Sequence, residues 1–405
     1  PHVYEPDAHI LKPGTLCYIR REGGKITGIY PVSISRELYD CAPIDLLDES
    51  LRPAASLEQL SPADRVFGWA NQSGHGAYRG HLRIGPVTCE TPAENAVELF
   101  DSPGLPLAIL GQPKPQQARF YVARNRSGHP QPDGLRKQEA GYSKGKGLRG
   151  RKFYTHHRSL PDGYWDNPLE DRTQQPRGRH FQEYRRPKLN GEEQRDSQNR
   201  SVQGWVKPGT TFTFDIYVEN LSKVELGALL WLLSLPEGCF HRIGGGKPLG
   251  FGSARLDIAD CKLYDNESWI NHYTQLADTP EAAGIQPVDQ KQLVGEFQKA
   301  VVAAYPPTKR GVSQGEDAFE GVPFIAAFLQ LAKGYEDGRP VHYPRARQKG
   351  QSGPVPPHPE GKSYEWFVAN DREGVKGMNG PGKSLPNAAS DPGLPILDPT
   401  PSGDR

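Results

Sequence analysis

Alternating apolar and polar residues mark a strand in the middle of the chain. The residues at 212, 214, 216 and 218 are apolar, and those between them are Thr213, Asp215 and Tyr217. This period of two predicts a strand that buries one face. A second strand is predicted over 251–258, directly after a glycine-rich stretch.

A helix is predicted between these two strands, over 222–235. Ser222 and Glu225 have the spacing of a capping box, in which each side chain bonds the other residue's backbone amide. Leucines at 226, 229, 230 and 233 recur with helical spacing and predict the buried stripe. Because Pro236 and Gly238 end the pattern, the expected order is strand, helix, glycine loop and strand.

The glycine loop reads I-G-G-G-K-P-L-G-F-G-S-A-R-L from Ile243 to Leu256. Glycine tolerates positive φ and has no Cβ, so a large flat ligand can approach the backbone closely. The loop lacks the residue order of a P-loop, and it precedes a strand, whereas a dinucleotide fingerprint opens a helix. A binding loop and a simple chain reversal both remain open. The candidate contacts in and beside it are Arg242, Gly244, Gly245, Gly246, Lys247, Gly250, Phe251, Gly252 and Arg255.

Shorter patterns predict further elements. Gly23 and Gly24 separate two β-prone runs, 15–20 and 25–30, and so predict a hairpin. Residues 78–84 predict a strand with Arg79, His81 and Arg83 on one face, and 119–124 predict another.

The C-terminal third is predicted to be helical and then extended. Apolar spacing predicts helices over 289–304 and 323–333. Beyond Gly334 the chain is rich in proline and glycine, and this tail is expected to lie on a neighbouring protein or on its own body, with Trp366 and Phe367 as anchors.

The net charge of +1 hides a strongly basic middle segment. Between Pro113 and Lys207 there are 21 Lys and Arg against 10 Asp and Glu, so the rest of the chain carries ten net negative charges. Such a segment predicts a surface that binds a polyanion. A solvated charged loop is the alternative.

Part of this segment combines cations with rings, in S-K-G-K-G-L-R-G-R-K-F-Y-T-H-H-R from Ser143 to Arg158. Lysine and arginine meet phosphates while rings stack on unpaired bases, so the pattern predicts binding of single-stranded RNA. The adjacent His156 and His157 suggest an alternative, acid–base cleavage of RNA. The candidate contacts are Arg149, Arg151, Lys152, Phe153 and Tyr154.

Composition limits the class of protein. A hydrophobic content of 35%, with 45 Gly and 39 Pro, predicts a loop-rich chain. No apolar run has the length of a membrane span, so no membrane partner is expected. The five cysteines are scattered and odd in number, which argues against a disulfide framework and predicts a cytoplasmic protein whose cysteines are buried rather than zinc-bound.

Taken together, seven stretches resemble the RAMP superfamily of CRISPR-associated proteins, in particular the large or fused backbone subunits of type III-D and III-E effectors. They occur in order along nearly the whole chain. Besides the glycine loop they are L-K-P-G-T-L-C-Y (Leu11–Tyr18), S-P-A-D-R-V-F-G-W (Ser61–Trp69), Y-R-G-H-L-R-I (Tyr78–Ile84), R-G-R-K-F-Y-T-H-H (Arg149–His157), V-H-Y-P-R (Val341–Arg345) and Y-E-W-F-V-A-N (Tyr364–Asn370).

The resemblance implies an α+β fold, with a ferredoxin-like (RRM-like) RAMP core, a long basic insertion, and a helical plus Pro-rich C-terminal extension. The expected segments are an N-terminal β element (1–60), two core halves (61–124 and 209–262), the insertion (125–208) and the extension (263–405). Since Met378 is the only methionine, and relatives carry a RAMP domain upstream, the chain is expected to be the C-terminal part of a longer protein.

The resemblance also implies the function. A CRISPR guide RNA, a complementary target RNA and other type III effector subunits are the expected partners in antiviral defence, and Arg36 and Arg79 join the expected RNA contacts. Target-cleaving members place an aspartate beside the RNA, so Asp40 or Asp45 is the expected catalytic residue, with Mg²⁺ as cofactor. A helix-start carboxylate is the alternative for either aspartate. A precursor-RNA nuclease that uses His156 or His157, and a non-catalytic assembly protein, are the competing classes.

Overall fold

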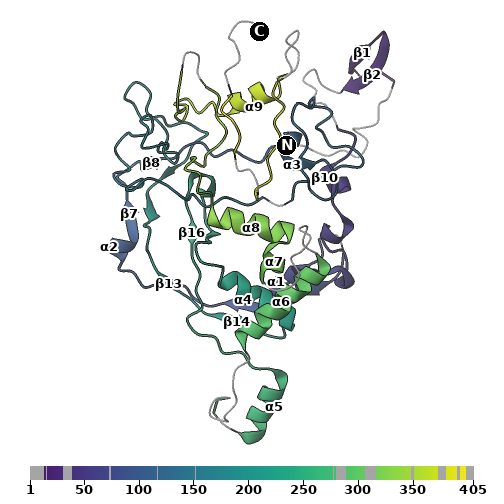
Figure 1. The fold of residues 1–405 in the computed structure, drawn as a ribbon, viewed down its shortest axis with the longest axis vertical. Helices are drawn as coiled ribbons and strands as arrows, with labels where there is room; N and C mark the ends of the chain where they lie inside the picture. Colours follow the sequence, from purple (N-terminus) through teal and green to yellow (C-terminus); the bar gives the residue numbers. More distant parts are fainter. Residues whose placement is uncertain are drawn as a thin grey trace.

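The computed structural model describes residues 13–14, 16–30, 39–72, 74–115, 117–150, 152–276, 278–279, 289–305, 316–347, 351–372, 380–389 and 393–397 (Figure 1). Within these ranges the chain is a mixture of helices and short antiparallel strands, which confirms the predicted α+β class. The named strands here pair two to a sheet. The described residues thus form no four-stranded sheet, and the ferredoxin-like core stays a prediction.

The elements are short and follow one another closely. The strands are β1 (Tyr18–Glu22), β2 (Lys25–Tyr30), β3 (Trp69–Ala70), β4 (Ala77–Tyr78), β5 (Leu82–Ile84), β6 (Thr88–Cys89), β7 (Val97–Leu99), β8 (Leu105–Pro106), β9 (Val122–Ala123), β10 (Gly147–Leu148), β11 (Ser201–Val202), β12 (Gly204–Val206), β13 (Phe212–Thr213), β14 (Ile216–Val218), β15 (His241–Arg242) and β16 (Ser253–Ala254). The α-helices are α1 (Pro62–Phe67), α2 (Ala93–Ala96), α3 (Ala118–Tyr121), α4 (Lys223–Leu233), α5 (Asn266–Gln275), α6 (Gln290–Ala304), α7 (Glu316–Glu320), α8 (Pro323–Lys333) and α9 (Tyr364–Asn370). Four 3-10 helices are η1 (Pro43–Leu46), η2 (Glu49–Leu51), η3 (Leu57–Gln59) and η4 (Lys247–Leu249).

Four strand pairs form one long antiparallel ribbon. The pairs β5–β14, β6–β13, β7–β12 and β8–β11 join the segment 82–106 to the segment 201–218. Backbone hydrogen bonds continue between the pairs, for example from Gly85 N to Asp215 O at 2.8 Å. Proline cannot donate such a bond, so the ladder is interrupted near Pro86, Pro92, Pro103 and Pro208.

The strand predicted over 212–218 forms two separate short strands, β13 and β14, within this ribbon. β13 and β14 flank Phe214 and Asp215, which pair with no strand. Phe212 and Phe214 are 45% and 37% exposed, whereas Ile216 is half-buried. The prediction of a single buried face is therefore wrong for the first half of the strand, because β13 pairs only with the two-residue β6.

The predicted helices are confirmed nearly to the residue. Ser222 Oγ accepts from Glu225 N and Glu225 Oε2 accepts from Ser222 N at 2.9 Å, so the capping box starts α4 as expected. Asp289 caps α6 through a bond from Lys291 N at 2.9 Å, and α8 spans the predicted 323–333.

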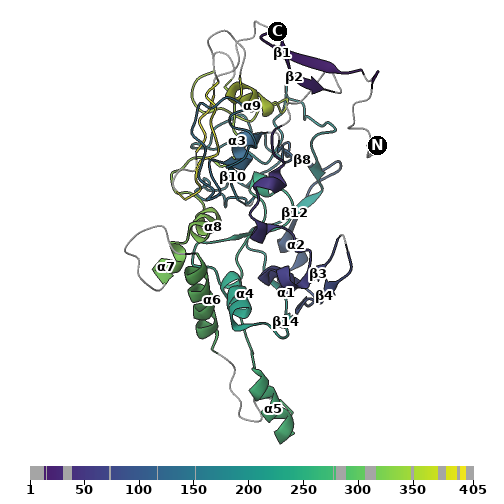
Figure 2. The same ribbon diagram turned by 90° about the vertical axis from the view of Figure 1, so that its right-hand side faces the viewer.

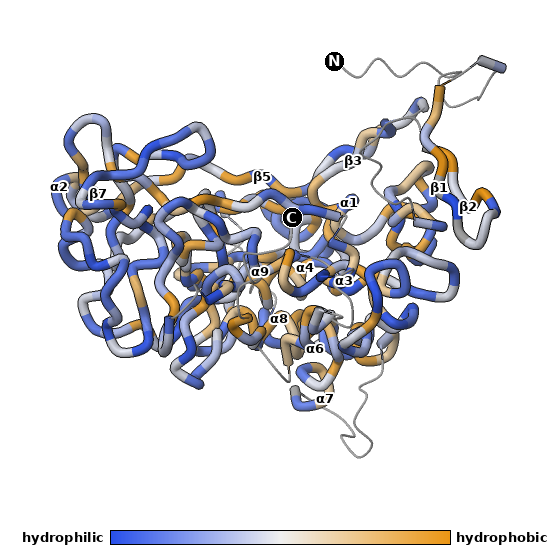
Figure 3. Tube along the Cα trace, turned by 90° about the horizontal axis from the view of Figure 1, so that it is seen from above, coloured by the Kyte–Doolittle hydropathy of each residue, from blue (hydrophilic) through white to orange (hydrophobic). Residues whose placement is uncertain are grey.

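Helices α4, α6, α7 and α8 pack around one buried cluster, and α4 and α6 lie side by side (Figure 2). The buried residues of α4 include Gly227, Leu230 and Trp231, whereas the other predicted stripe leucines are half-buried. A Cβ at Gly227 would overlap the carbonyl oxygen of Leu293 in α6, so this glycine sets how closely the helices approach. In Figure 3 hydrophobic colouring occurs on these helices and also elsewhere, for example near β1 and β5; the buried cluster between the helices is Trp231, Phe319, Val322 and Ile325.

A second core is built from aromatic rings of the predicted insertion. Tyr164 and Tyr184 are buried with Leu105 and Leu107 of the ribbon and with Leu249 of the glycine loop. The Tyr164 hydroxyl donates to Phe181 O at 2.7 Å, which satisfies its polar atom inside the core. The segment predicted to be an irregular insertion therefore supplies the packing on which the glycine loop rests.

Two predicted strands need correction. Residues 78–84 are divided into β4 and β5, because Gly80 passes so close to the end of α1 that a Cβ there would lie 2.6 Å from Phe67 O. Residues 119–124 begin as helix α3 and continue as β9. The buried Arg119 forms an ion pair with Asp371, and this tertiary contact accompanies the helical turn.

The ends of the described chain behave as predicted. β1 and β2 form the hairpin around Gly23 and Gly24. Trp366 is fully buried, donates to Pro395 O at 2.9 Å and packs against Phe120, so the tail is anchored on the protein's own body, through the short helix α9.

No helix of the described chain is long and apolar enough to cross a membrane.

Candidate nucleic-acid interface

The glycine loop connects two paired strands. β15 and β16 are antiparallel, with Arg242 opposite Ser253, and Ile243 N donates to Gly252 O at 2.9 Å. The loop was predicted to follow the helix directly, and the short β15 corrects that order. Helix η4 forms inside the loop between Gly246 and Gly250, which both have positive φ. The loop is thus an ordered hairpin connection rather than an open chain.

The glycines of the loop fall into two groups. A Cβ at Gly252 would overlap the carbonyl oxygen of Ile243, and one at Gly250 would lie 2.8 Å from His157 Nδ1. Gly246 is similarly restricted by the Phe251 ring. These three glycines are required by the packing of the loop itself.

Gly244 and Gly245 differ from the other loop glycines because a side chain at either position would have open space. Both are exposed, and a Cβ at either position would meet no atom within 4 Å. Their backbone amides have no hydrogen-bond partner in the part of the chain that is described. These amides are free to bind an anionic group such as a phosphate.

Arg242 holds the loop together from inside. Its Nη2 donates to Lys247 O at 2.8 Å, and its Nη1 donates to Ser253 Oγ. Burial lowers the pKa of Arg242 to about 10, so the guanidinium stays charged at neutral pH. Because Nη1 and Nη2 bond atoms of the loop and the side chain is half-buried, Arg242 stabilises the loop and is poorly placed to contact a ligand.

Two lysines and one ring meet beside the open glycines. Lys152 Nζ lies 4.9 Å from the centre of the Tyr154 ring, and Lys247 Nζ lies 5.7 Å from the same centre. Lys247 also donates to Gly244 O. Segments about 95 residues apart in sequence therefore place two ammonium groups and an aromatic face next to free backbone amides. Such a group matches what single-stranded RNA needs, cations for phosphate and a ring for a base.

The neighbouring histidines are held in place by the fold. His156 Nδ1 lies 2.8 Å from Ser253 Oγ, and the ring stacks on Phe240 at 4.4 Å. His157 is buried. Burial, followed by the positive charge of Arg242, lowers the pKa of His156 to about 4 and that of His157 to about 3. Both imidazoles are neutral at pH 7, which is the form that a general base requires, so the cleavage alternative with either histidine as the base stays a prediction.

Several other predicted contacts pack inside the protein. Phe251 lies 5.2 Å from Trp165 and 5.4 Å from Trp205, ring centre to ring centre, in the aromatic core. Phe153 packs edge-on against Phe328 of α8. Arg149 donates to Pro386 O at 2.9 Å, and burial lowers its pKa. Phe251 and Phe153 are occupied by the fold, whereas Arg149 keeps Nε and Nη1 without a partner among the described residues.

The remaining predicted cations are more exposed but paired. Arg255 contacts both carboxylate oxygens of Asp257 at 3.0 Å. Arg79 lies 3.4 Å from Glu219, and both side chains are mostly exposed. Arg36 and Arg151 lie outside the described residues.

The candidate catalytic aspartates lie elsewhere, on the segment around η1. Asp45 Oδ2 accepts from Ala42 N at 2.8 Å, so this carboxylate caps η1, as the alternative expectation had it. Asp40 is exposed. In the described ranges no group of three or more His, Cys, Asp and Glu side chains could hold a metal ion. Mg²⁺ as a cofactor stays a prediction, and no step through a metal is derived from these carboxylates.

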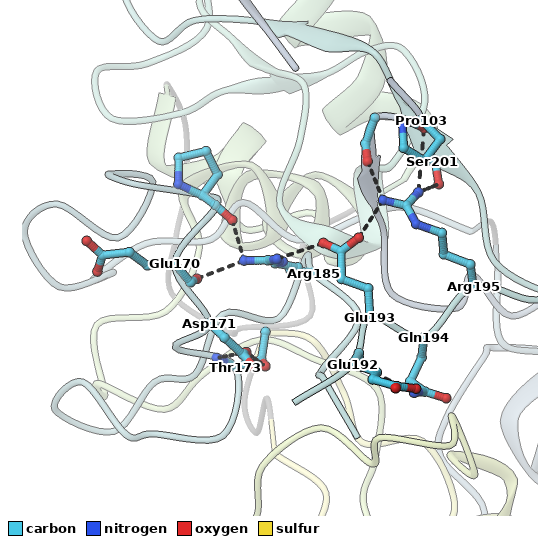
Figure 4. A network of polar contacts seen from close by, with 12 residues as sticks. Pro103, Glu170, Asp171, Thr173, Arg185, Glu192, Glu193, Gln194, Arg195 and Ser201 are labelled. Carbon is cyan, nitrogen blue, oxygen red and sulfur yellow. Dashed lines mark hydrogen bonds and ion pairs between the residues drawn. The ribbon is translucent and has the colours of Figure 1, made fainter. Parts of the chain in front are cut away.

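Some arginines of the basic middle segment form hydrogen bonds and ion pairs inside the protein (Figure 4). Arg185, only 1% exposed, donates to Pro168 O at 2.8 Å and to Glu170 O at 2.9 Å, and it pairs with Glu193 at 3.0 Å. Glu193 in turn pairs with Arg195 at 2.6 Å. The basic middle segment is therefore not simply a solvated charged loop, and its count of positive charges overstates what can reach RNA.

Sequence patterns missed Ser253, which bonds both Arg242 and His156. Its place in the G-F-G-S run was the available signal. The five cysteines form no disulfide in the structure; only Cys239 is buried, and the expectation of buried cysteines is wrong for the exposed Cys17 and Cys89. No protein-family model matches the chain, and no curated protein matches its sequence.

Proposed function

We propose that this chain binds single-stranded RNA by its sugar–phosphate backbone, as a guide-RNA-binding backbone subunit of a type III CRISPR effector of the RAMP superfamily. In this proposal the core is ferredoxin-like, the protein works in the cytoplasm beside other effector subunits, and base pairing with target RNA supplies the sequence selectivity.

One observation carries the proposal. Lys152 and Tyr154 lie beside Lys247 and the open glycines Gly244 and Gly245. A phosphate at the free amides would meet two ammonium groups, while an adjacent base could stack on Tyr154. Because none of these groups reads a base edge, the contact would be independent of sequence, as a protein that carries many different guides requires.

The salt dependence of RNA binding tests this interface. Each phosphate contact contributes about −0.7 to the slope of log Kobs against log salt for single strands. Lys152→Gln and Lys247→Gln are each expected to weaken binding of an unstructured labelled RNA and to reduce the slope by about 0.7. Fluorescence anisotropy over a range of salt concentrations measures both quantities.

Lys291→Gln is the matched control, because Lys291 is exposed on α6 and belongs to none of the loop contacts. It should leave the slope unchanged. An unchanged slope in both loop variants, with intact thermal melting, would contradict the interface. Sequencing the RNA that copurifies with the native complex tests the CRISPR assignment: repeat-derived guides are expected, and the absence of RNA would point to an assembly protein.

A further inference from the structure

A cavity of about 220 Å³ lies behind the glycine loop. Pro248 and Leu249 of η4 form part of its wall, and residues 342–343, 345–346, 355–359 and 361–363 of the C-terminal segment form another part. Ile109 and Val355 add apolar surface. An apolar cavity of about 150 Å³ already holds a benzene ring. The cavity is therefore large enough for a ring system of nucleobase size, with any attached sugar outside.

Two buried charged residues that line the cavity have unused polar atoms. Arg186 is 4% exposed; its Nε donates to Pro359 O at 2.9 Å and its Nη2 pairs with Asp196 at 3.0 Å. Its Nη1 has no partner among the described residues, and it lies 3.4 Å from where a Cβ on the lining residue Gly361 would stand.

The second is Glu183, which is 6% exposed. One of its carboxylate oxygens pairs with the buried Arg345, which also donates to Val355 O. Its other oxygen, Oε1, has no partner in the described ranges. Leaving a buried charged group partly unsatisfied is unfavourable, and native proteins rarely tolerate it without a ligand or another partner.

We propose that this cavity binds the base of a guanine nucleotide. Guanine presents the acceptors O6 and N7, which suit a guanidinium, and N–H donors on its Watson–Crick edge, which suit a carboxylate. Adenine places an amino donor where guanine has O6, so Arg186 discriminates against it. The lining cations Arg186, Arg345 and Lys362 each pair with a carboxylate, so the base is recognised by the unpartnered Arg186 Nη1 and Glu183 Oε1 and not by an excess of positive charge.

Two sources can supply this base: a free guanine mononucleotide, or a guanosine in RNA held at the glycine loop. The second rests on the proposed function, since η4 borders both the loop and the cavity; the first does not. Calorimetric titration of the full chain with GMP and with AMP tests the first source. Anisotropy with RNA that contains one guanosine, or adenosine in its place, tests the second.

GMP is expected to bind about tenfold more tightly than AMP if the free nucleotide is the ligand, and guanosine RNA about tenfold more tightly than its adenosine counterpart if RNA is. Discrimination in either experiment supports the cavity and identifies its source. Equal affinity in both experiments overturns the proposal. RNA binding without discrimination, together with equal affinity for GMP and AMP, would leave the proposed function standing while this inference fails.

Substitutions at the cavity test whether it is the site of the guanine preference. Arg186→Lys keeps the charge but loses the unpartnered Nη1 donor, and it should abolish the guanine preference. Ala346→Leu fills the cavity from a partly buried lining position and should do the same without touching the ion pairs. Arg172→Lys, at an exposed pair with Glu170, is the control. If both cavity variants melt normally and keep the preference, the cavity is not the site.

Discussion

At the scale of single residues, position in the fold decides chemistry. His156 and His157 resemble a catalytic pair in sequence, yet each is packed against the glycine loop, by Ser253 and Gly250 respectively. Burial and the nearby Arg242 charge lower both histidine pKa values far below the ordinary 6.5. Both neutral imidazoles therefore support the loop.

This role predicts a pH-dependent stability. Below pH 6.5 the unfolded chain protonates these histidines while the folded chain does not, so the free energy of unfolding is highest above that pH. The free energy of unfolding should fall as the pH drops from 6.5. The contribution of His156 is lost by about pH 4, and that of His157 by about pH 3. Urea unfolding at about pH 7.5 and about pH 5 measures the loss.

His157→Gln should remove part of this pH dependence, because glutamine does not titrate. His75→Gln, at an exposed histidine, should leave the dependence unchanged. An NMR titration that places the His157 midpoint near pH 6.5 would contradict the burial argument.

At the scale of elements, the contact between α4 and α6 depends on one glycine. Gly227 faces Leu293 across the contact, where a Cβ would overlap the Leu293 carbonyl oxygen. Gly295 lies inside α6, and a Cβ there would meet nothing within 4 Å. Substitution by alanine should therefore lower the stability of the protein at Gly227 and raise it at Gly295.

Gly295→Ala is expected to stabilise the chain by about 0.4–1 kcal/mol, because alanine reduces the entropy of the unfolded chain and suits a helix. Gly227→Ala should destabilise it by about 1–3 kcal/mol through overpacking between the helices. Urea unfolding of both variants gives the two signs, and stabilisation by Gly227→Ala would show that the helices are not held as closely as described.

At the scale of the whole molecule, the C-terminal tail is part of the core. Trp366 is fully buried against Phe120, and its indole N–H bonds Pro395. Lys383 pairs with Asp133, so the tail is also fixed to the middle segment. The tail and the residues after α3 should therefore unfold together.

Trp366→Ala should cost about 3–5 kcal/mol and make the tail sensitive to protease. Tyr364 is 53% exposed in the same helix, so Tyr364→Ala should change stability by no more than about 0.5 kcal/mol. Limited proteolysis with mass spectrometry, together with urea unfolding, measures both effects. Equal protease resistance in the two variants would mean that Trp366 does not anchor the tail.

The local elements could be predicted because their signals lie within a few residues. The capping box of Ser222 and Glu225, the Asp289 cap and the Gly23–Gly24 turn each settled an element without help from distant contacts. Predictions failed where a distant contact intervened. Gly80 lies against Phe67 and breaks a predicted strand, and Arg119 turns inward to Asp371.

The sequence by itself determined helices α4, α6 and α8, the Gly23–Gly24 turn and the basic character of the middle segment, since these depend on residue type and short spacing. Only the tertiary structure decided which cations remain available: it buried Arg185 in an ion-pair network and placed Lys152 beside Lys247. It likewise turned Phe251 into the core while leaving Gly244 open. Burial and pairing arise between segments far apart in the chain, and spacing along the sequence carries no record of them.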